Sequence, residues 1–399
     1  MVLMIGCFFD CQPRIRSTLF KAMTLSDVAI ASYPFTTIKP NSGVGYVKID
    51  CADKDFNTQC NPRFGQCVEH KRFIPVQLID VAGLVPGASE GKGMGNQFLD
   101  DLNQADALVH VIDISGSINE NGEPVPVGSY NPANDIRFLE HELDLWYLRL
   151  IEKGWEKFAR QINQEKADVK KAIAKQLSSL RVTESIMQDV VPRLKLSEDI
   201  MKWDADARMR LAVELRRITK PMMIACNKID LPSGKENFER LKKEFPNFIM
   251  IPCSGDCELA LREAGKHGMI KYISGEKDFE ILHPEKLNDK QRNALEYIRK
   301  NILDVFGSTG IQDVINNAVF NLLGYFAVFP AGVNNLKDKD GNVLPDCFLM
   351  PPKTTALEFA FRIHTDLGKK FIRALDVRTK KPVGKDHVLK HRDMVEIIT

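Results

Sequence analysis

The first residues that could form a ligand site are an acid and a group of glycines that follow an apolar run. Residues 73–79 form a short run rich in branched side chains, which predicts a buried strand ending on Asp80. Gly83 follows within the sequence DVAG, and a glycine-rich segment continues to Gly95. Because ligands of open α/β sheets bind beyond the carboxyl ends of strands, Asp80 can hold Mg²⁺ and Gly83 can approach a phosphate. The four-residue pattern also occurs in ordinary loops, so its meaning depends on other segments.

A second strand end carries side chains suited to a purine base. Residues 221–226 predict another buried strand, and the sequence Asn227-Lys228-Ile229-Asp230 follows directly. The Asp230 carboxylate can accept two hydrogen bonds from the N1 and N2 hydrogens of guanine. Adenine lacks that pair of donors and would leave the acid without them, which is costly. The Lys228 stem can lie along the base, while Asn227 can tie the loop to the phosphate side.

Two more segments can complete such a site. A strand predicted for residues 248–254 ends at Ser254-Gly255, where a backbone N–H can meet the guanine carbonyl oxygen. The segment YPFTTIKPN, residues 33–41, has a proline near each end and is expected to be extended or irregular. Its hydroxyls, Thr37 among them, can coordinate Mg²⁺, although an edge strand would explain the same residues.

The start of the chain predicts a strand, a loop and a helix, the place for a phosphate-binding loop. Residues 2–6 predict the strand, and Ser17-Thr18 opens an apolar helical stretch. The usual loop pattern is GxxxxGK[ST], in which glycines expose backbone N–H groups and the lysine reaches the phosphates. Here Arg16 stands at the lysine position, whereas Ile15 and Asp10 stand where glycines are expected. Arg16 keeps the cation, but Ile15 disfavours a positive φ.

Three cysteines and a histidine lie between two predicted strands. Cys51, Cys60, Cys67 and His70 follow the spacing C-x8-C-x6-C-x2-H. Thiolates and an imidazole can bind zinc, although the first spacing is long for a zinc knuckle. Unpaired thiols in a β-excursion are the favoured interpretation, and zinc remains the alternative.

Composition narrows the class of protein. The 399 residues are 44% hydrophobic and 27% charged, with a net charge of +2, so no global field draws the chain onto nucleic acid. No apolar run reaches the roughly 20 residues that span a bilayer, and the first residues lack the basic start of a signal peptide. Nine cysteines without framework spacing suit reduced thiols. We therefore expect a soluble cytoplasmic protein with no membrane partner and no evident DNA specificity; its oligomeric state is left open.

Strands and helices alternate along most of the chain, which is typical of an α/β fold. Residues 107–113 form another apolar strand, and its His110 is expected to be a hydrogen-bonded core residue. Residues 131–219 carry apolar side chains at helical spacing and predict a helical insertion. Its lysines are interpreted as a solvated face, and contact with RNA is the alternative. The predicted domains are 1–130 and 220–324 for the two parts of the α/β domain, 131–219 for the insertion, and 325–399 for a small α+β module. That module is rich in lysine and arginine, so an RNA-binding surface is an open alternative to a solvated one.

The ordered segments YPFTTIKPN, DVAGLVPGA, NKID and SGD closely resemble the Obg-like translation-factor GTPases, in particular their YchF-related archaeal branch. The segment TTALEFAFRIHTDLGKKFIRALDVRTKKPVG resembles a TGS domain, a small ubiquitin-like module. The resemblance covers nearly the whole chain. It implies an α/β fold, namely a P-loop NTPase G domain with a mostly parallel sheet and a helical insertion.

The resemblance also implies roles for particular residues. It implies Asn227, Lys228 and Asp230 as readers of the base, with help from Ser254 and Gly255. It implies phosphate contacts and Mg²⁺ ligands near the other motifs. The phosphate side comprises Arg16, Ser17, Thr18 and Gly83, and Mg²⁺ would be held by Ser17, Thr37 and Asp80. Since the chain keeps NKID, GTP is expected rather than ATP, and the ribosome or RNA is the implied partner.

Two departures affect what can be carried over. Leu84 stands where many GTPases have a water-orienting glutamine, as it does in this family, so no catalytic residue is named. Between Gly6 and Ser17 the family pattern is lost, with sharp edges on both sides. A reading-frame or gene-model error over about residues 7–16 is our hypothesis for that gap, which resequencing the locus would test. The leading functional prediction is a GTP-binding, slowly hydrolysing switch; the alternative is a pseudo-GTPase that acts as a ribosome or RNA adaptor.

Overall fold

The structure, a computed structural model, describes residues 2–6, 13–24, 42–80, 102 and 104–399. Its contacts divide the chain into two compact units. The first unit comprises Met1–Ser17 and Ile79–Met250, and the second comprises Thr18–Leu78 and Ile251–Thr399. Each unit is therefore assembled from two separate stretches of sequence.

The strands at the centre of the first unit are parallel and fully covered. Strand β5 (Ala107–Asp113) pairs in parallel with β1 (Val2–Gly6) on one side and with β6 (Met222–Asn227) on the other. Every residue of β5 and β6 is buried. Parallel strands covered on both faces read as continuous apolar runs, which is why the sequence predicted them well. The strands predicted at 2–6 and 107–113 are confirmed, and that at 221–226 lies one residue from β6.

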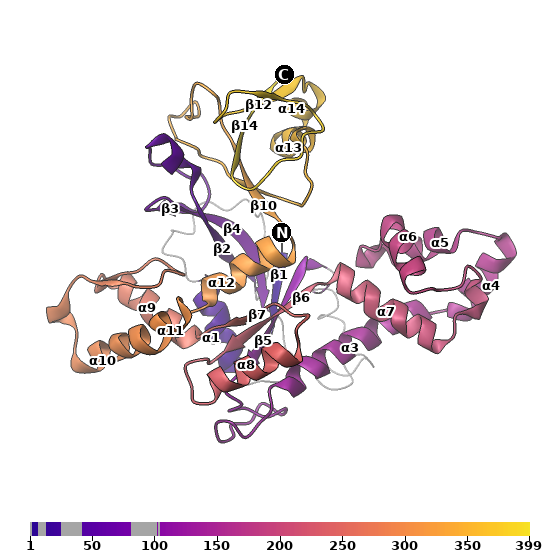
Figure 1. Ribbon diagram of the computed structural model, residues 1–399, viewed down its shortest axis with the longest axis horizontal. Helices are drawn as coiled ribbons and strands as arrows, with labels where there is room; N and C mark the ends of the chain where they lie inside the picture. The colour runs from indigo at the N-terminus through magenta and orange to yellow at the C-terminus, as the bar shows by residue number, and fades with distance from the viewer. Residues whose placement is uncertain (1, 7–12, 25–41, 81–101, 103) are drawn as a thin grey trace. The chain divides into compact units, whose positions relative to one another are not determined.

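Helices in the first unit share one apolar core with these strands. Figure 1 shows α3 (Ala133–Glu152) and α7 (Ala205–Thr219) side by side, running from the strands toward the shorter helices. Leu108 of β5 and Met222 of β6 belong to the same buried cluster as Trp146 and Trp203. The remaining helical elements are α4 (Trp155–Glu165), α5 (Val169–Gln176), η3 (Ser178–Leu180), α6 (Glu184–Arg193), η4 (Ile200–Lys202) and α8 (Gly234–Glu244).

The second unit contains the strands that frame the cysteines. Strand β2 (Ser42–Asp50) leads into a short 3-10 segment, η1 (Ala52–Phe56), and β3 (Gln66–Val68) pairs antiparallel with β4 (Lys71–Asp80). Helix α12 (Ile311–Asn316) is hydrogen-bonded to β2 through Gln312 and Asn316. The other elements before the C-terminal module are β7 (Met250–Pro252), α9 (Gly255–Lys266), β8 (Ile270–Lys271), β9 (Glu280–Ile281), η5 (Pro284–Lys286), α10 (Asp289–Ile298), η6 (Arg299–Leu303), α11 (Asp304–Phe306) and η7 (Asn317–Leu322).

The end of the chain folds as a small α+β module around its own core. Its five strands follow the order β11 (Phe348–Met350), β10 (Phe326–Pro330), β14 (Asp393–Ile398), β12 (Arg373–Asp376), β13 (Pro382–Val383), with β10 and β14 parallel. Helix α13 (Ala356–Ile363) begins at a reciprocal capping box between Thr355 and Glu358, which satisfies two backbone donors of its first turn. The remaining element of the module is α14 (Thr365–Lys369).

Some predicted boundaries are wrong. The strand predicted for residues 248–254 covers only Met250–Pro252, and Ser254 lies outside it. Helix α1 extends over Pro13–Thr24 and so begins four residues before Ser17, where the sequence predicted its start. Proline suits the first turn of a helix because its fixed φ is helical and its missing N–H has no partner there anyway. Among the described residues, no helix is both long enough and apolar enough to cross a membrane.

Candidate functional site

The predicted base-reading motif lies where two parallel strands end together. In the register of β5 and β6, Asp113 is opposite Asn227. The Ile114 N–H donates to the Asn227 carbonyl across this edge, at 3.0 Å. Since the carboxyl ends of neighbouring parallel strands meet at one edge, the loops that follow Asp113 and Asn227 are brought together.

The sequence Asn227-Lys228-Ile229-Asp230 forms a tight turn at this edge. Asn227 is buried, and Lys228 has a φ of +64°, a left-handed conformation that is costly for a non-glycine residue. The Leu231 N–H returns to the Lys228 carbonyl at 3.1 Å, and Ile229 is buried beneath the turn. Asp230 is half-buried at the end of this turn. The backbone is thus constrained at the point where the side chains must hold a fixed geometry.

The Lys228 ammonium is held by an acid that the sequence analysis missed. Its Nζ lies 3.0 Å from Asp113 Oδ2 and donates to Ser117 Oγ, also at 3.0 Å. The Asp113 side chain is 4% exposed and that of Lys228 is 19% exposed. An ion pair this sheltered is screened less by salt than a surface pair. The turn therefore has a positioning contact on the neighbouring strand end.

Asp113 is itself held by the loop that follows it. Its Oδ1 accepts from the Ser115 N–H at 3.0 Å and from Ser115 Oγ at 2.6 Å, while its Oδ2 accepts from Ser117 Oγ at 2.6 Å. Ser233 Oγ donates to the Ser115 carbonyl at 2.9 Å, and Asn237 Nδ2 donates to the Ile114 carbonyl at 2.9 Å. These bonds lock the loop after β5 to the segment after β6. An acid at the end of an apolar strand, followed by ISGS, was the only local signal for this arrangement.

Ser254 and Gly255 begin helix α9 in the second unit. Ser254 is buried, its Oγ accepts from the Cys257 N–H at 3.3 Å, and its own N–H donates to the Thr309 carbonyl at 2.9 Å. The Ser254 N–H is thus engaged within the protein, and Ser254 acts as the N-cap of α9. Its hydroxyl and the N–H groups that follow remain the candidates for a contact with the base.

A buried carboxylate braces this helix start. Glu258 is fully buried and accepts from Thr309 Oγ1 at 2.5 Å, Arg262 Nε at 2.6 Å and Ser274 Oγ at 2.6 Å. Burial acts to raise the pKa of Glu258, but the charge of Arg262 and the hydrogen bonds outweigh it and hold the pKa below its usual value. Glu258 therefore carries its charge. Its hydrogen bond with Thr309 fixes the segment whose carbonyl accepts from the Ser254 N–H.

The predicted phosphate and metal residues are described only in part. Thr37 and Gly83 lie outside the described residues, as do Leu84 and residues 7–12 of the proposed sequence error. Arg16 and Ser17 lie on α1, whose side chains are described from Thr18 onward, and Thr18 is half-buried. Asp80 is buried at the end of β4, the position expected from the sequence.

The predicted burial of His110 in the core is confirmed. It lies inside β5 with 1% of its surface exposed, and burial lowers its pKa to about 3. The ring is therefore neutral near pH 7 and carries no charge into the strand edge where Asp113 and Lys228 meet.

Family models match three segments of the chain. Residues 16–138 match a model described as a 50S ribosome-binding GTPase, and residues 336–399 match the TGS domain. Residues 225–332, which begin just before the NKID turn, match the G4 motif-containing domain of the YGR210-like Obg-like GTPases.

Similar proteins extend the likeness over nearly the whole length. A relative named as an uncharacterized GTP-binding protein of Methanocaldococcus jannaschii is 46% identical over 385 residues, 96% of each chain. The ribosome-binding ATPase YchF of Escherichia coli O157:H7 is 26% identical over 405 residues, 96% of this chain and 95% of that one. The crystal structure of a GTP-binding protein from Pyrococcus horikoshii OT3 covers all of both chains with 37% identity and a TM-score of 0.78.

Proposed function

Because the chain belongs to the YchF-related Obg-like GTPases, with a P-loop G domain and a C-terminal TGS domain, we propose that it is a guanine-nucleotide-dependent, slowly hydrolysing switch protein. The observation that carries the guanine assignment is the constrained turn at the end of β6, with Lys228 held by Asp113 and Asp230 placed just beyond it. The relatives' names favour nucleotide binding over a nucleotide-independent adaptor.

In this proposal Asp230 accepts the two guanine hydrogens and Lys228 lays its stem along the base. The Asp113 and Ser117 contacts hold the Lys228 ammonium at the far end, so that the stem is presented in one orientation. Asn227 ties the turn to the phosphate side, and Ser254 with Gly255 meets the base carbonyl. Preorganised groups of this kind lower the ordering cost of binding.

The phosphate side is proposed from the motifs. Arg16, Ser17, Thr18 and Gly83 would contact the phosphates, and oxygen ligands from Ser17, Thr37 and Asp80 suit Mg²⁺, which prefers hard oxygen donors. Bound Mg²⁺ would neutralise charge on the phosphates. The segments 33–41 and 80–95 would be ordered by the γ-phosphate and released on hydrolysis. A ribosome-binding relative supports the ribosome as the partner that reads this change in the cytoplasm.

The test is a titration with fluorescent GTP, with and without Mg²⁺, followed by competition with GTP, XTP and ATP. We expect saturable, Mg²⁺-dependent binding for which GTP competes better than ATP. The variant Asp230→Asn should weaken GTP and favour XTP, because the amide donates where the carboxylate accepted. With two charge-assisted hydrogen bonds affected, a loss of at least about 1.5–3 kcal/mol, roughly 10- to 100-fold in affinity, is expected.

Glu236→Gln is the matched control, since Glu236 is exposed in the first turn of α8, close in sequence to Asp230. It should leave the preference for GTP unchanged. An unchanged GTP-to-XTP ratio in Asp230→Asn would refute the base-reading role, and ATP competing as well as GTP would refute the guanine assignment.

A further inference from the structure

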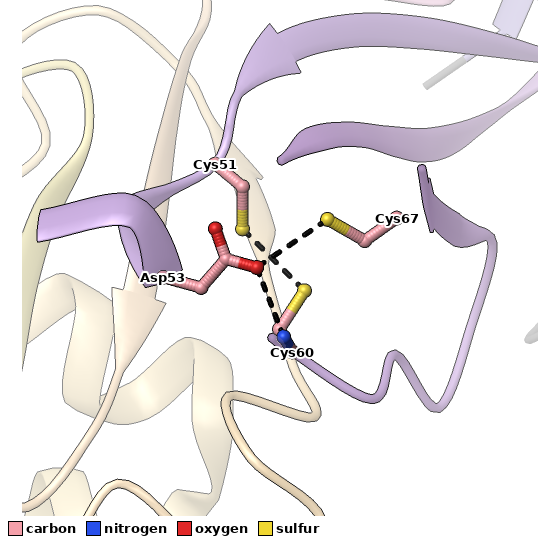
Figure 2. A group of neighbouring side chains, drawn as sticks. All are labelled: Cys51, Asp53, Cys60 and Cys67. Carbon is pink, nitrogen blue, oxygen red and sulfur yellow. Dashed lines mark hydrogen bonds between the residues drawn. The ribbon is translucent and has the colours of Figure 1, made fainter. Parts of the chain in front are cut away.

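A cluster of sulfur and oxygen ligands lies in the segment between β2 and β4, residues 51–70, here called the β2–β4 excursion. Figure 2 shows the side chains of Cys51, Asp53, Cys60 and Cys67 pointing toward one another. One ligand atom from each lies within 4.8 Å of all the others. Asp53 has no exposed surface, and Cys51 and Cys60 are also buried. Residues separated by up to sixteen positions are therefore gathered around one point.

The spacings match those that a tetrahedral zinc site requires. Cys51 Sγ lies 3.4 Å from Cys60 Sγ, and Cys67 Sγ lies 3.6 Å from Asp53 Oδ2. Zinc–sulfur bonds of about 2.3 Å in tetrahedral geometry would separate two sulfurs by roughly 3.8 Å. Because all the ligand atoms lie within 4.8 Å of one another, shifts of about half an ångström or less per atom would admit the ion. Packing alone gives no reason for three thiols and a carboxylate to converge.

The buried acid has one weak contact that a cation would improve. A buried carboxylate must be paired or hydrogen-bonded. Asp53 accepts from the Cys60 N–H at 2.9 Å, contacts His70 Nδ1 at 3.0 Å and receives a long, weak Cys67 thiol contact. A cation beside Oδ2 would replace that weakest contact with a strong one. His70 would then remain on Oδ1.

Arg72 supplies a second cation at the rim of the cluster. Its side chain is fully buried, and Nη1 lies 3.4 Å from Cys60 Sγ. Three thiolates and a carboxylate around a divalent ion leave an excess of negative charge. The guanidinium offsets part of that excess, so a dianionic site need not be buried alone.

We propose that Cys51, Asp53, Cys60 and Cys67 bind a structural Zn²⁺. Thiolates select zinc over the hard cations Mg²⁺ and Ca²⁺, and a set of four protein ligands leaves no open position for substrate. The ligand set differs from the spacing-based expectation, because Asp53 takes the fourth position that the sequence suggested for His70. His70 instead contacts Oδ1 of Asp53 and orients the carboxylate, as hydrogen-bonding partners of metal ligands commonly do.

The proposed zinc site would also stabilise an interface, because the β2–β4 excursion is hydrogen-bonded to the C-terminal module. The Asn61 N–H donates to the Val343 carbonyl at 2.8 Å, and the Arg63 N–H donates to the Pro345 carbonyl at 2.9 Å. Arg72 donates to the carbonyls of Leu344 and Pro345 at 3.0 and 2.8 Å. A segment of this length with few apolar residues has little core of its own, so a metal would hold it in shape for these contacts.

Arginine side chains of the module also contact the excursion. Arg378 of the module reaches Asp55 at 2.8 Å, and Arg392 Nη2 donates to the carbonyl of the ligand residue Cys51 at 3.3 Å. Loss of the ion should therefore loosen the C-terminal module as well as the excursion.

The experiment uses the full chain without a histidine tag. Elemental analysis of the purified protein should find close to one zinc per chain. After chelation and dialysis, Co²⁺ should restore a thiolate-to-cobalt charge-transfer band and the intense visible bands of a tetrahedral site. Cys60→Ser and Asp53→Ala should lose the metal, whereas Cys347→Ser, a thiol outside the ligand set, should keep it. His70→Ala should keep it with an affinity about 10- to 100-fold lower.

Several results would overturn the proposal. They are a metal-free chain that shows no tetrahedral cobalt spectrum, a Cys51–Cys60 disulfide in freshly purified protein, or loss of zinc in Cys347→Ser. If Cys60→Ser fails to fold, the cobalt titration of the wild-type chain decides the question independently. Limited proteolysis provides the structural readout: removal of zinc should speed cleavage within 51–70 and the module, and an unchanged pattern would refute the clamping role.

Discussion

The contact between Lys228 and Asp113 makes a quantitative prediction about the strand edge. Asp113→Asn keeps the shape of the side chain but removes its charge. Either the NH2 group or the uncharged carbonyl oxygen of the amide then faces the Lys228 ammonium. Removing one partner of a buried pair costs about 3–5 kcal/mol, because the other charge is left uncompensated. The Lys228 side chain retains 19% exposure, so water can recover part of that loss. We therefore expect Asp113→Asn to lower the free energy of unfolding by about 3 kcal/mol.

The reverse substitution should cost less. In Lys228→Met the Asp113 carboxylate still accepts from the Ser115 N–H, Ser115 Oγ and Ser117 Oγ. One charge-assisted hydrogen bond is lost, and the carboxylate is still hydrogen-bonded. We therefore expect the free energy of unfolding to fall by about 1.5 kcal/mol. The double variant should be less destabilised than the sum of the two, with a coupling energy of about 2 kcal/mol.

Tryptophan fluorescence during denaturant unfolding is the assay. The chain has three tryptophans, and all lie in the first unit: Trp146 and Trp155 are on α3 and α4, and Trp203 follows η4. Trp146 and Trp203 share a core with Leu108 and Met222 of the strands that carry the pair. Their signal therefore reports the unit under test, which matters because a chain with more than one unit need not unfold in one step.

Asp189→Asn is the control. It removes an exposed pair with Arg193 on α6, at 3.4 Å, and should cost less than about 0.5 kcal/mol. The reasoning fails if the two substitutions at the strand edge add to within about 0.5 kcal/mol, since independent sites behave that way. It also fails if Lys228→Met is the more costly of the two.

Two further predictions concern a buried acid and a glycine. Burial raises the pKa of Asp135 to about 7 from 3.8, so the folded chain binds a proton between these pH values that the unfolded chain does not. Stability from this group falls as pH rises from about 4 to about 7, and Asp135→Asn should gain over wild type across that window, by at most about 4 kcal/mol at pH 8. Melting temperatures followed by tryptophan fluorescence at pH 5 and pH 8 test it, and a pH-independent difference would contradict it. Gly310 has a φ of +80°, and an added Cβ would lie 2.0 Å from the Pro252 carbonyl, whereas Gly307 has a φ of +81° with nothing within 4 Å. Gly310→Ala should therefore cost well over the roughly 1–2 kcal/mol expected for Gly307→Ala from left-handed backbone alone, as circular dichroism melting would show; equal costs would rule out the clash.

Local patterns were sufficient for the elements and for the residues of the base-reading turn. The apolar runs at 2–6 and 107–113 became β1 and β5, because parallel strands covered on both faces need continuous apolar sequence. The overall fold class predicted from the ordered motifs is confirmed by the family models and the similar structures. The start of α1 was predicted wrongly, because helix ends depend on capping rather than on periodicity.

The contacts that position those residues were not visible in the sequence. Asp113 and Lys228 are 115 positions apart, and only the pairing of β5 with β6 aligns their strand ends. The cysteine spacing suggested His70 as the fourth ligand, but the short helical turn η1 aims Asp53 inward and leaves His70 outside it. The sequence of this chain by itself determined where the strands lie and which residue types follow each one, because strand formation depends on local patterns. Which of them meet depends on strand register and on the path of the chain between strands, and only the tertiary structure decided that.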